Sequence, residues 1–126
     1  MSPHPAAFSP VVLVVEDETL LRILAVDFLE DEGFTVLEAG TAEEAWLILE
    51  SRADIGVLFT DVNMPGRLDG FGLAREVALR WPGITIIVCS GAAKPLPGDL
   101  PAKARFIDKP YSPALVHEVV RELRAG

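Results

Sequence analysis

The sequence predicts an α/β protein in which helices cover both faces of a parallel sheet. Three observations lead to this fold class. Short runs of β-branched and other apolar residues alternate with longer stretches whose apolar residues recur every three or four positions. Most of the short runs have no polar face, as expected of strands that are buried on both sides. No internal repeat or linker divides the 126 residues, so we expect one compact unit.

Five segments have the composition of strands. The first is apolar throughout, the second is weaker, and the third and fourth are apolar almost to their last residues. The expected strands are 11–15, 35–39, 55–60, 84–89 and 105–108. For five parallel strands the common arrangement is the flavodoxin-like, doubly wound order 2-1-3-4-5. In that order the first and third strands are neighbours, and the crossovers on either side of them leave toward opposite faces.

Four stretches have helical periodicity and recognisable ends. They are 19–32, 41–51, 69–81 and 112–123. Gly33 is a typical residue for ending the first helix. Thr41 has capping-box spacing with Glu44 at the start of the second helix. Asp69 can cap the third helix, and Ser112 stands before a proline at the first position of the last one.

The apolar positions predict which side of each helix packs on the sheet. In the first helix Leu20, Leu24 and Phe28 stand four residues apart, with Leu21 beside them. In the other helices the expected core residues are Ala42, Ala45, Trp46, Leu49, Leu73, Val77, Trp81, Leu115, Val116, Val119, Val120 and Leu123.

The segment between the last two strands departs from this alternation. Residues 91–103 contain three prolines and two glycines. Each interior proline costs a helix about 3 kcal/mol, and Gly98 adds about 1 kcal/mol. We therefore expect the fourth helix to be shortened or missing. An irregular loop would replace it and cover the sheet with Leu96 or Leu100.

Composition argues against several classes of protein. The formal net charge is −8, which disfavours binding to nucleic acid or to an anionic membrane through charge. No apolar run approaches the roughly 20 residues of a membrane span. The single cysteine, Cys89, cannot form an internal disulfide, so we expect a reducing compartment and a cytoplasmic protein. Residues 1–10 carry three prolines and no Lys or Arg, so we expect a flexible leader before a domain spanning 11–126.

Polar residues of complementary kinds follow four of the five expected strands. They are Glu16 and Asp17 after the first, Asp61 after the third, Ser90 after the fourth and Lys109 after the fifth. Because open α/β sheets bind ligands at the carboxyl ends of their strands, we expect these side chains to meet in one crevice. Each residue alone is a common turn or cap residue, but their coincidence at four strand ends indicates a single site.

Three carboxylates and a lysine suggest metal-assisted phosphoryl chemistry. Neighbouring carboxylates repel each other by about 1 to 4 kcal/mol per close pair, which a divalent cation offsets. Mg²⁺ prefers oxygen ligands and keeps several waters, so one or two direct carboxylates suffice. A carboxylate can also act as a nucleophile and form an acyl phosphate. We expect Lys109 at the open edge of the sheet, where its loss would change stability by less than about 1 kcal/mol.

Two other classes of protein share this topology or chemistry. A flavin carrier needs a phosphate-binding loop after the first strand, where Glu16, Asp17 and Glu18 would repel a phosphate. A phosphatase of the haloacid dehalogenase type would place Asp-x-Asp after the first strand, and that spacing does not occur there.

The residues at the strand ends resemble a known family. The chain is similar to the receiver domain of two-component response regulators from Val11 to about Leu123. The motifs that carry the resemblance are Val-Val-Glu-Asp-Glu at 14–18, Thr-Asp-Val-Asn-Met-Pro at 60–65, Ser-Gly at 90–91 and Phe-Ile-Asp-Lys-Pro at 106–110.

The resemblance implies a phosphorylation site and a metal site. Asp61 would accept a phosphoryl group from a phosphohistidine on a sensor histidine kinase or a phosphotransfer protein. Asp17, Asp61 and the backbone carbonyl of Asn63 would ligate Mg²⁺, with Glu16 acting through water. Lys109 would pair with the phosphoryl oxygens. The domain would catalyse its own phosphorylation and dephosphorylation and turn over no separate substrate.

The resemblance also implies a switch that changes a protein-binding surface. Ser90 would move to hydrogen-bond the phosphate, and Phe106 would swing inward to fill the space. Without the fourth helix, the dimer interface that many transcriptional receivers build on it should be absent. Recognition of the kinase or target would then rely on the first and last helices.

Several alternatives stay open. No DNA-binding segment follows before Gly126, so we expect output through contact with an unidentified protein, or a receiver that was cut from a hybrid kinase or a larger regulator. A receiver-fold binding module that works without phosphorylation is the other alternative. The complete set of acids, hydroxyl and lysine disfavours it.

Overall fold

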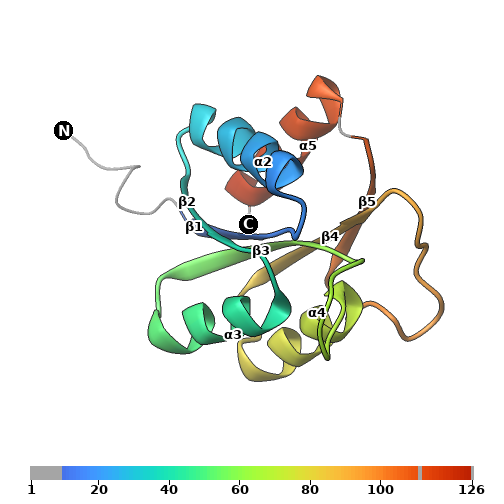
Figure 1. The fold of residues 1–126 in the computed structure, drawn as a ribbon. Coiled ribbons are helices and arrows are strands. Elements are labelled where there is room, and N and C mark those ends of the chain that lie inside the picture. The colour runs from blue at the N-terminus through green and yellow to red at the C-terminus, as the bar shows by residue number, and fades with distance from the viewer. Residues whose placement is uncertain (1–9, 111, 126) are drawn as a thin grey trace.

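The fold is a parallel sheet of five strands between two layers of helices (Figure 1). The computed structural model describes residues 10–110 and 112–125, so the expected leader lies outside the described residues except for Pro10. The strands are β1 (Val11–Val15), β2 (Thr35–Ala39), β3 (Ile55–Asp61), β4 (Thr85–Ser90) and β5 (Arg105–Asp108). Their order is β2-β1-β3-β4-β5, which confirms the expected fold class and strand order.

Two strands extend one residue further than the sequence pattern indicated. β3 includes Asp61, which lies opposite Cys89 in the neighbouring strand. β4 includes Ser90, which lies opposite Asp108. Both polar residues therefore belong to the strand ladder, whose hydrogen bonds fix the position of their backbones.

In the described part of the chain four helices cover the sheet, α2 and α5 on one face and α3 and α4 on the other (Figure 1). They are α2 (Thr19–Asp31), α3 (Ala42–Ser51), α4 (Gly70–Arg80) and α5 (Pro113–Ala125). The predicted caps are confirmed. Backbone N–H groups donate to Thr41 Oγ1 over 3.1 Å, to Asp69 Oδ1 over 2.8 Å and to Ser112 Oγ over 3.1 Å. Gly33 follows α2 with φ of 96°, a conformation that favours glycine.

Two apolar layers hold the helices to the sheet. Alternate residues of each strand point to opposite layers, because the side chains of a strand alternate between its faces. Leu13, Leu58 and Val88 belong to the layer under α3 and α4. Val12 and Ile87 belong to the layer under α2 and α5. The central strands are therefore buried on both sides, as their apolar sequences predicted.

The apolar faces of α3, α4 and α5 are largely as predicted. Ten of the expected core residues pack in or against the two layers: Ala42, Ala45, Trp46, Leu49, Leu73, Val77, Trp81, Leu115, Val119 and Val120. Trp46 and Trp81 are only half-buried and contact each other edge to face, with ring centroids 4.9 Å apart. The side chains of Val116 and Leu123 lie outside the described residues.

The predicted apolar face of α2 was wrong. Leu20, Leu24 and Phe28 are 69%, 43% and 37% exposed, whereas α2 packs on the sheet through Ala25, Val26 and Leu29. The helix is apolar on two sides, so periodicity alone did not identify the buried one. The face that includes the small Ala25 side chain lies against the sheet, and Leu20 and Leu24 on the other side face solvent.

The segment between β4 and β5 is an irregular loop, as its prolines predicted, and none of residues 91–104 is helical. Leu100 packs against the core, whereas Leu96 is 69% exposed, so only one of the two expected anchors is used. A second attachment joins the loop to α4, because Arg75 Nη1 donates to the Asp99 carbonyl oxygen over 3.1 Å.

Candidate functional site

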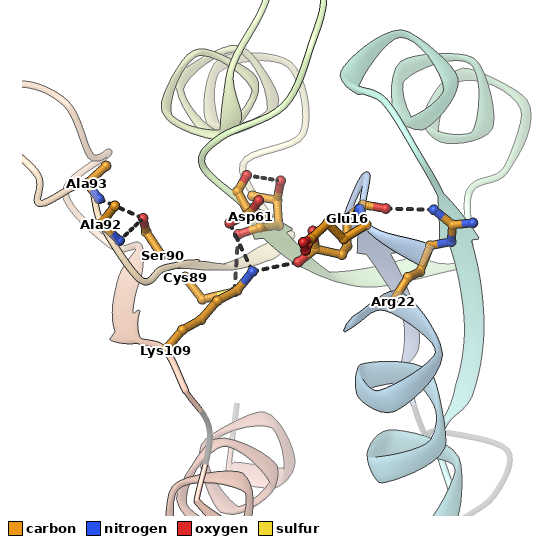
Figure 2. A network of polar contacts seen from close by, with 10 residues as sticks. Glu16, Arg22, Asp61, Cys89, Ser90, Ala92, Ala93 and Lys109 are labelled. Atoms are coloured by element: carbon orange, nitrogen blue, oxygen red, sulfur yellow. Dashed lines mark hydrogen bonds and ion pairs between the residues drawn. The ribbon is translucent and has the colours of Figure 1, made fainter. Parts of the chain in front are cut away.

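The predicted polar residues meet at the carboxyl edge of the sheet (Figure 2). Glu16 directly follows β1, and its N–H donates to the Ala39 carbonyl oxygen of β2 over 3.0 Å. Asp61 is the last residue of β3, the neighbour of β1 in the sheet. Lys109 directly follows β5, and its N–H donates to the Ser90 carbonyl oxygen over 2.9 Å. The ends of β1, β3 and β5 therefore deliver Glu16, Asp61 and Lys109 to one place.

Three carboxylates form a cluster at this edge. One oxygen from each of Glu16, Asp17 and Asp61 lies within 4.8 Å of the others. Glu16 and Asp61 are buried, whereas Asp17 is exposed and leaves one side of the cluster open to solvent. Carboxylate oxygens that converge in this way are suitable ligands for Mg²⁺, so the donor set fits the expected ion.

The Lys109 ammonium lies between two of these acids (Figure 2). Its Nζ is 2.6 Å from Glu16 Oε1 and 3.2 Å from Asp61 Oδ1. The lysine side chain is only 14% exposed, so it is more buried than we expected of a residue at an open edge. The physical reason is that Glu16 and Asp61 themselves lie inside the crevice and attract the ammonium there. Lys109 is thus a counter-ion for both acids.

Burial shifts the protonation of all three groups. Loss of hydration raises the pKa of Asp61 above its ordinary value of 3.8, although Lys109 opposes the rise. Loss of hydration likewise raises the pKa of Glu16 above 4.5, against the effect of its hydrogen bond to Lys109. Burial disfavours the charged ammonium, but hydrogen bonding to Glu16 and attraction by Asp61 outweigh it, so the pKa of Lys109 is also raised. Lys109 therefore offsets only part of the cost of burying the two carboxylates.

The two predicted switch residues lie on neighbouring strands, Ser90 at the end of β4 and Phe106 within β5. Ser90 is fully buried, and its Oγ accepts hydrogen bonds from the N–H groups of Ala92 at 3.2 Å and Ala93 at 2.9 Å (Figure 2). Phe106 is half-buried, and its ring stacks on Phe71 with centroids 6.4 Å apart. The Ser90 hydroxyl therefore fixes the first residues of the loop between β4 and β5.

The remaining predicted ligand, Asn63, lies two residues after Asp61 and is exposed. Its role as a carbonyl ligand stays a prediction. In the same connection, Arg67 is exposed, and its N–H donates to Glu43 Oε2 of α3 over 3.1 Å. This bond attaches the long loop after β3 to the neighbouring helix.

Sequence reasoning missed one residue that shapes the site. Gly70, the first residue of α4, donates its N–H to the Val62 carbonyl oxygen over 2.8 Å. A β-carbon at this position would lie only 1.9 Å from the Asp61 carbonyl oxygen. The dipeptide Asp69-Gly70 also fits an ordinary helix cap, so the sequence by itself does not indicate this close contact. The start of α4 can approach the end of β3 this closely only because residue 70 has no side chain.

Comparison with known proteins identifies the family. Residues 12–121 match the family described as the response regulator receiver domain. The chain belongs to this family. It is 37% identical over 121 residues to the sensor kinase CckA of Brucella abortus, covering 91% of this chain and 12% of that relative. It is 34% identical over 113 residues to the chemotaxis protein CheY1 of Helicobacter pylori, covering 85% of this chain and 90% of that relative.

The solved structures of receiver domains include a response regulator receiver protein from Sinorhizobium medicae WSM419. It superimposes with a TM-score of 0.85 at 25% sequence identity, and the match covers 94% of this chain and 96% of that one. This receiver domain therefore matches almost the whole of CheY1 but only a small part of CckA. None of the helices in its described residues is long and apolar enough to cross a membrane.

Proposed function

We propose that this receiver domain is a phosphorylation-dependent switch in which Asp61 accepts a phosphoryl group from a phosphohistidine. The donor would be a sensor histidine kinase or a phosphotransfer protein. The observation that carries the proposal is the position of the Asp61 carboxylate. One of its oxygens lies 3.2 Å from Lys109 Nζ, and the carboxylates of Glu16 and Asp17 lie close enough to share a metal ion with it. A phosphoryl group on Asp61 would therefore lie near two cations, Lys109 and a bound metal ion.

The chemistry follows from this arrangement. An Asp61 carboxylate oxygen attacks the phosphorus, the P–N bond of the phosphohistidine breaks, and its electrons return to the imidazole nitrogen. The product is an aspartyl acyl phosphate. Glu16, Asp17, Asp61 and the Asn63 carbonyl would hold Mg²⁺, which, when bound, neutralises charge on the phosphoryl oxygens. Lys109 supplies the second positive charge by moving from Glu16 to a phosphoryl oxygen.

The acyl phosphate would act on the rest of the domain through Ser90. In the present state the hydroxyl oxygen accepts hydrogen bonds from Ala92 and Ala93. To donate to a phosphoryl oxygen, the hydroxyl has to turn away from these N–H groups. The start of the loop at 91–104 would then lose its attachment, and Phe106 would move toward the vacated space.

Partner recognition would rely on α2 and α5, which lie side by side on one face of the sheet (Figure 1). The exposed Leu20, Ile23, Leu24 and Phe28 give α2 an apolar strip near the acidic cluster. A kinase or phosphotransfer protein bound there would bring its phosphohistidine to Asp61. The dimer face that many transcriptional receivers build on the helix between β4 and β5 would be absent, because that segment is a loop here.

A second candidate function has one observation in its favour. Lys109 forms ion pairs with both Glu16 and Asp61, so a side chain of the protein itself neutralises part of the acidic charge of the site. A receiver domain with such a site could act as a binding module that is never phosphorylated. The small share of CckA that the chain covers also leaves room for a receiver that is one part of a larger regulator.

Intact-mass spectrometry distinguishes the two candidate functions. The protein is incubated with acetyl phosphate and Mg²⁺, and the masses of wild type, Asp61→Asn and Asp54→Asn are compared. Asp54 is an exposed acid paired with Arg52, before the start of β3, and serves as the control. We expect one added phosphoryl group in wild type and in Asp54→Asn, and none in Asp61→Asn. An unmodified wild type, or an Asp61→Asn protein that is modified at Asp17, would contradict the proposal.

A further inference from the structure

Arg22 of α2 reaches back to the acidic end of β1 (Figure 2). Its Nη1 donates to the Glu16 carbonyl oxygen over 2.7 Å, and its Nε donates to Glu38 Oε1 over 2.9 Å. The arginine side chain is 20% exposed, so the guanidinium is largely covered in this position. Glu38 belongs to β2, the strand that pairs directly with β1, so the ion pair holds the guanidinium beside the end of β1.

The carbonyl that Arg22 contacts lies just beyond the ladder between β1 and β2. The paired residues of these two strands end at Val15 and Ala39. The strand ladder therefore no longer sets the orientation of the peptide that joins Glu16 to Asp17. A charged donor at 2.7 Å is a strong hydrogen bond and can fix that orientation.

Orientation of this peptide determines where the Asp17 carboxylate lies. The peptide unit is planar, so fixing the Glu16 carbonyl also fixes the direction in which the chain enters Asp17. Asp17 is the exposed member of the acidic cluster and receives less support from packing than Glu16 and Asp61. Glu16 is also held through its side chain, because Oε1 accepts from Lys109 and Oε2 accepts from the Glu18 N–H.

We propose that Arg22 is a positioning residue for the metal site and acts through the Glu16 carbonyl to hold Asp17 within the cluster. Arg22 does not touch the reacting atoms. Its role is to keep the Glu16–Asp17 peptide in the orientation that brings three carboxylates within 4.8 Å of one another. This inference rests on the proposed Mg²⁺ site and assigns a function to a residue outside it.

Electrostatics alone predicts the opposite effect of losing Arg22. A guanidinium close to the acidic cluster repels a divalent cation, so its removal should strengthen Mg²⁺ binding if charge were its only contribution. A positioning role predicts weaker binding, because Asp17 would no longer be held in place. The sign of the change in Mg²⁺ affinity therefore separates the two interpretations.

The experiment is a calorimetric Mg²⁺ titration of the full chain. Arg22→Met is the main variant, because it keeps an unbranched stem and removes both the charge and the donors. Arg52→Met is the matched control, since Arg52 is an ion-paired arginine just before the start of β3, at the opposite end of that strand from Asp61. We expect the dissociation constant to rise about tenfold in Arg22→Met, the scale found for residues that orient metal ligands. It should stay within about twofold in Arg52→Met.

Two further measurements keep the outcome decisive. Without Mg²⁺, the amide resonance of Asp17 should shift in Arg22→Met more than in Glu38→Gln, which retains the arginine. Arg22→Lys keeps one charged donor nitrogen, so it should bind Mg²⁺ more tightly than Arg22→Met but less tightly than wild type. If Arg22→Met does not fold, Arg22→Lys is the main variant. Unchanged or tighter Mg²⁺ binding by the Arg22 variants, with wild type binding normally, would overturn the role of Arg22. Absence of Mg²⁺ binding by wild type would instead overturn the proposed function.

Discussion

Gly70 approaches Asp61 so closely that a β-carbon on Gly70 would lie 1.9 Å from the Asp61 carbonyl oxygen. The neighbouring atoms belong to the backbone of Asp61 and Val62, so they cannot move away without displacing the candidate phosphoacceptor. The start of α4 can therefore contact the end of β3 only because residue 70 has no side chain.

The first prediction is that Gly70→Ala destabilises the protein by about 1 to 3 kcal/mol, the usual cost of forcing an extra group into a packed site. Asp61 should also be displaced, so phosphorylation by acetyl phosphate should slow. Urea unfolding measures the first effect and mass spectrometry the second. Gly83→Ala is the control, because nothing lies within 4 Å of its added β-carbon. Equal stabilities of the two variants would contradict the close contact.

The second prediction concerns Lys109. In metal-free buffer, Lys109→Met should destabilise the protein by about 1 to 3 kcal/mol, because Glu16 and Asp61 lose their shared counter-ion while buried. Addition of Mg²⁺ should recover part of this loss by binding the folded state. Lys103→Met, at an exposed lysine, is the control for loss of charge. A Lys109 variant as stable as this control would favour the smaller effect that the sequence suggested.

The third prediction is a dependence of stability on pH without metal. The pKa values of Glu16 and Asp61 are raised in the fold, chiefly by burial. Folded protein therefore binds more protons than unfolded protein above the ordinary values of 4.5 and 3.8. The favourable contribution of each acid is complete below its ordinary value and is lost as pH rises through the folded pKa. The pKa of Lys109 is also raised, above its ordinary value of 10.5. Its contribution to stability is therefore lost in the same direction, as pH rises through the folded pKa at alkaline pH.

Asp61→Asn tests this sign directly. An asparagine side chain does not titrate in this range. The free energy of unfolding of the variant relative to wild type should therefore increase as pH rises from about 4 to 7, by about 1 kcal/mol in total. Urea unfolding in EDTA at several pH values gives the difference, in which the titration of other surface groups cancels. A difference that decreases with rising pH would mean that the pKa of Asp61 is lowered in the fold.

The fourth prediction separates docking from chemistry. Leu20→Ser and Leu24→Ser change exposed residues of α2, so stability should change by less than about 0.5 kcal/mol. Phosphorylation by acetyl phosphate should be unaffected, whereas transfer from a phosphorylated partner protein should slow at least about fivefold. Leu79→Ser, at an 81% exposed residue of α4, is the control on the other face. Slower transfer in the control alone would move the docking site to α4.

The fifth prediction concerns the loop between β4 and β5. Leu100→Ala should cost about 1 to 2 kcal/mol because the side chain packs against the core. Leu96→Ala should change stability by less than about 0.5 kcal/mol, since this leucine is 69% exposed. Thermal or urea unfolding of the two variants provides a direct comparison. Similar losses in both would mean that Leu96 also anchors the loop.

The strand order and the gathering of site residues could be predicted from sequence because both follow from local signals. Apolar runs located the strands, and the rule that parallel strands end at one edge brought Glu16, Asp61 and Lys109 together. The absence of a helix at 91–103 could also be predicted from local sequence, because proline disfavours helix in its own turn and at the residue before it.

Features that depend on distances between elements could not be predicted. Leu20 and Ala25 belong to different apolar sides of α2, and only the space above the sheet decides which side is buried. The close approach at Gly70 depends on the path of the loop after β3. The contact of Arg22 with Glu16 joins a helix to a turn, and its sequence signal is one arginine among several.

The prolines at 95, 97 and 101 also affect the unfolded state of the protein. Each proline restricts the unfolded chain, and at a compatible position this restriction stabilises the folded form by about 0.4 to 1 kcal/mol through lost entropy. Folding this irregular segment therefore costs less conformational entropy than folding an irregular segment of the same length without prolines. Displacement of Ser90 would then move the loop between a few defined conformations, and the Leu100 side chain would move with it.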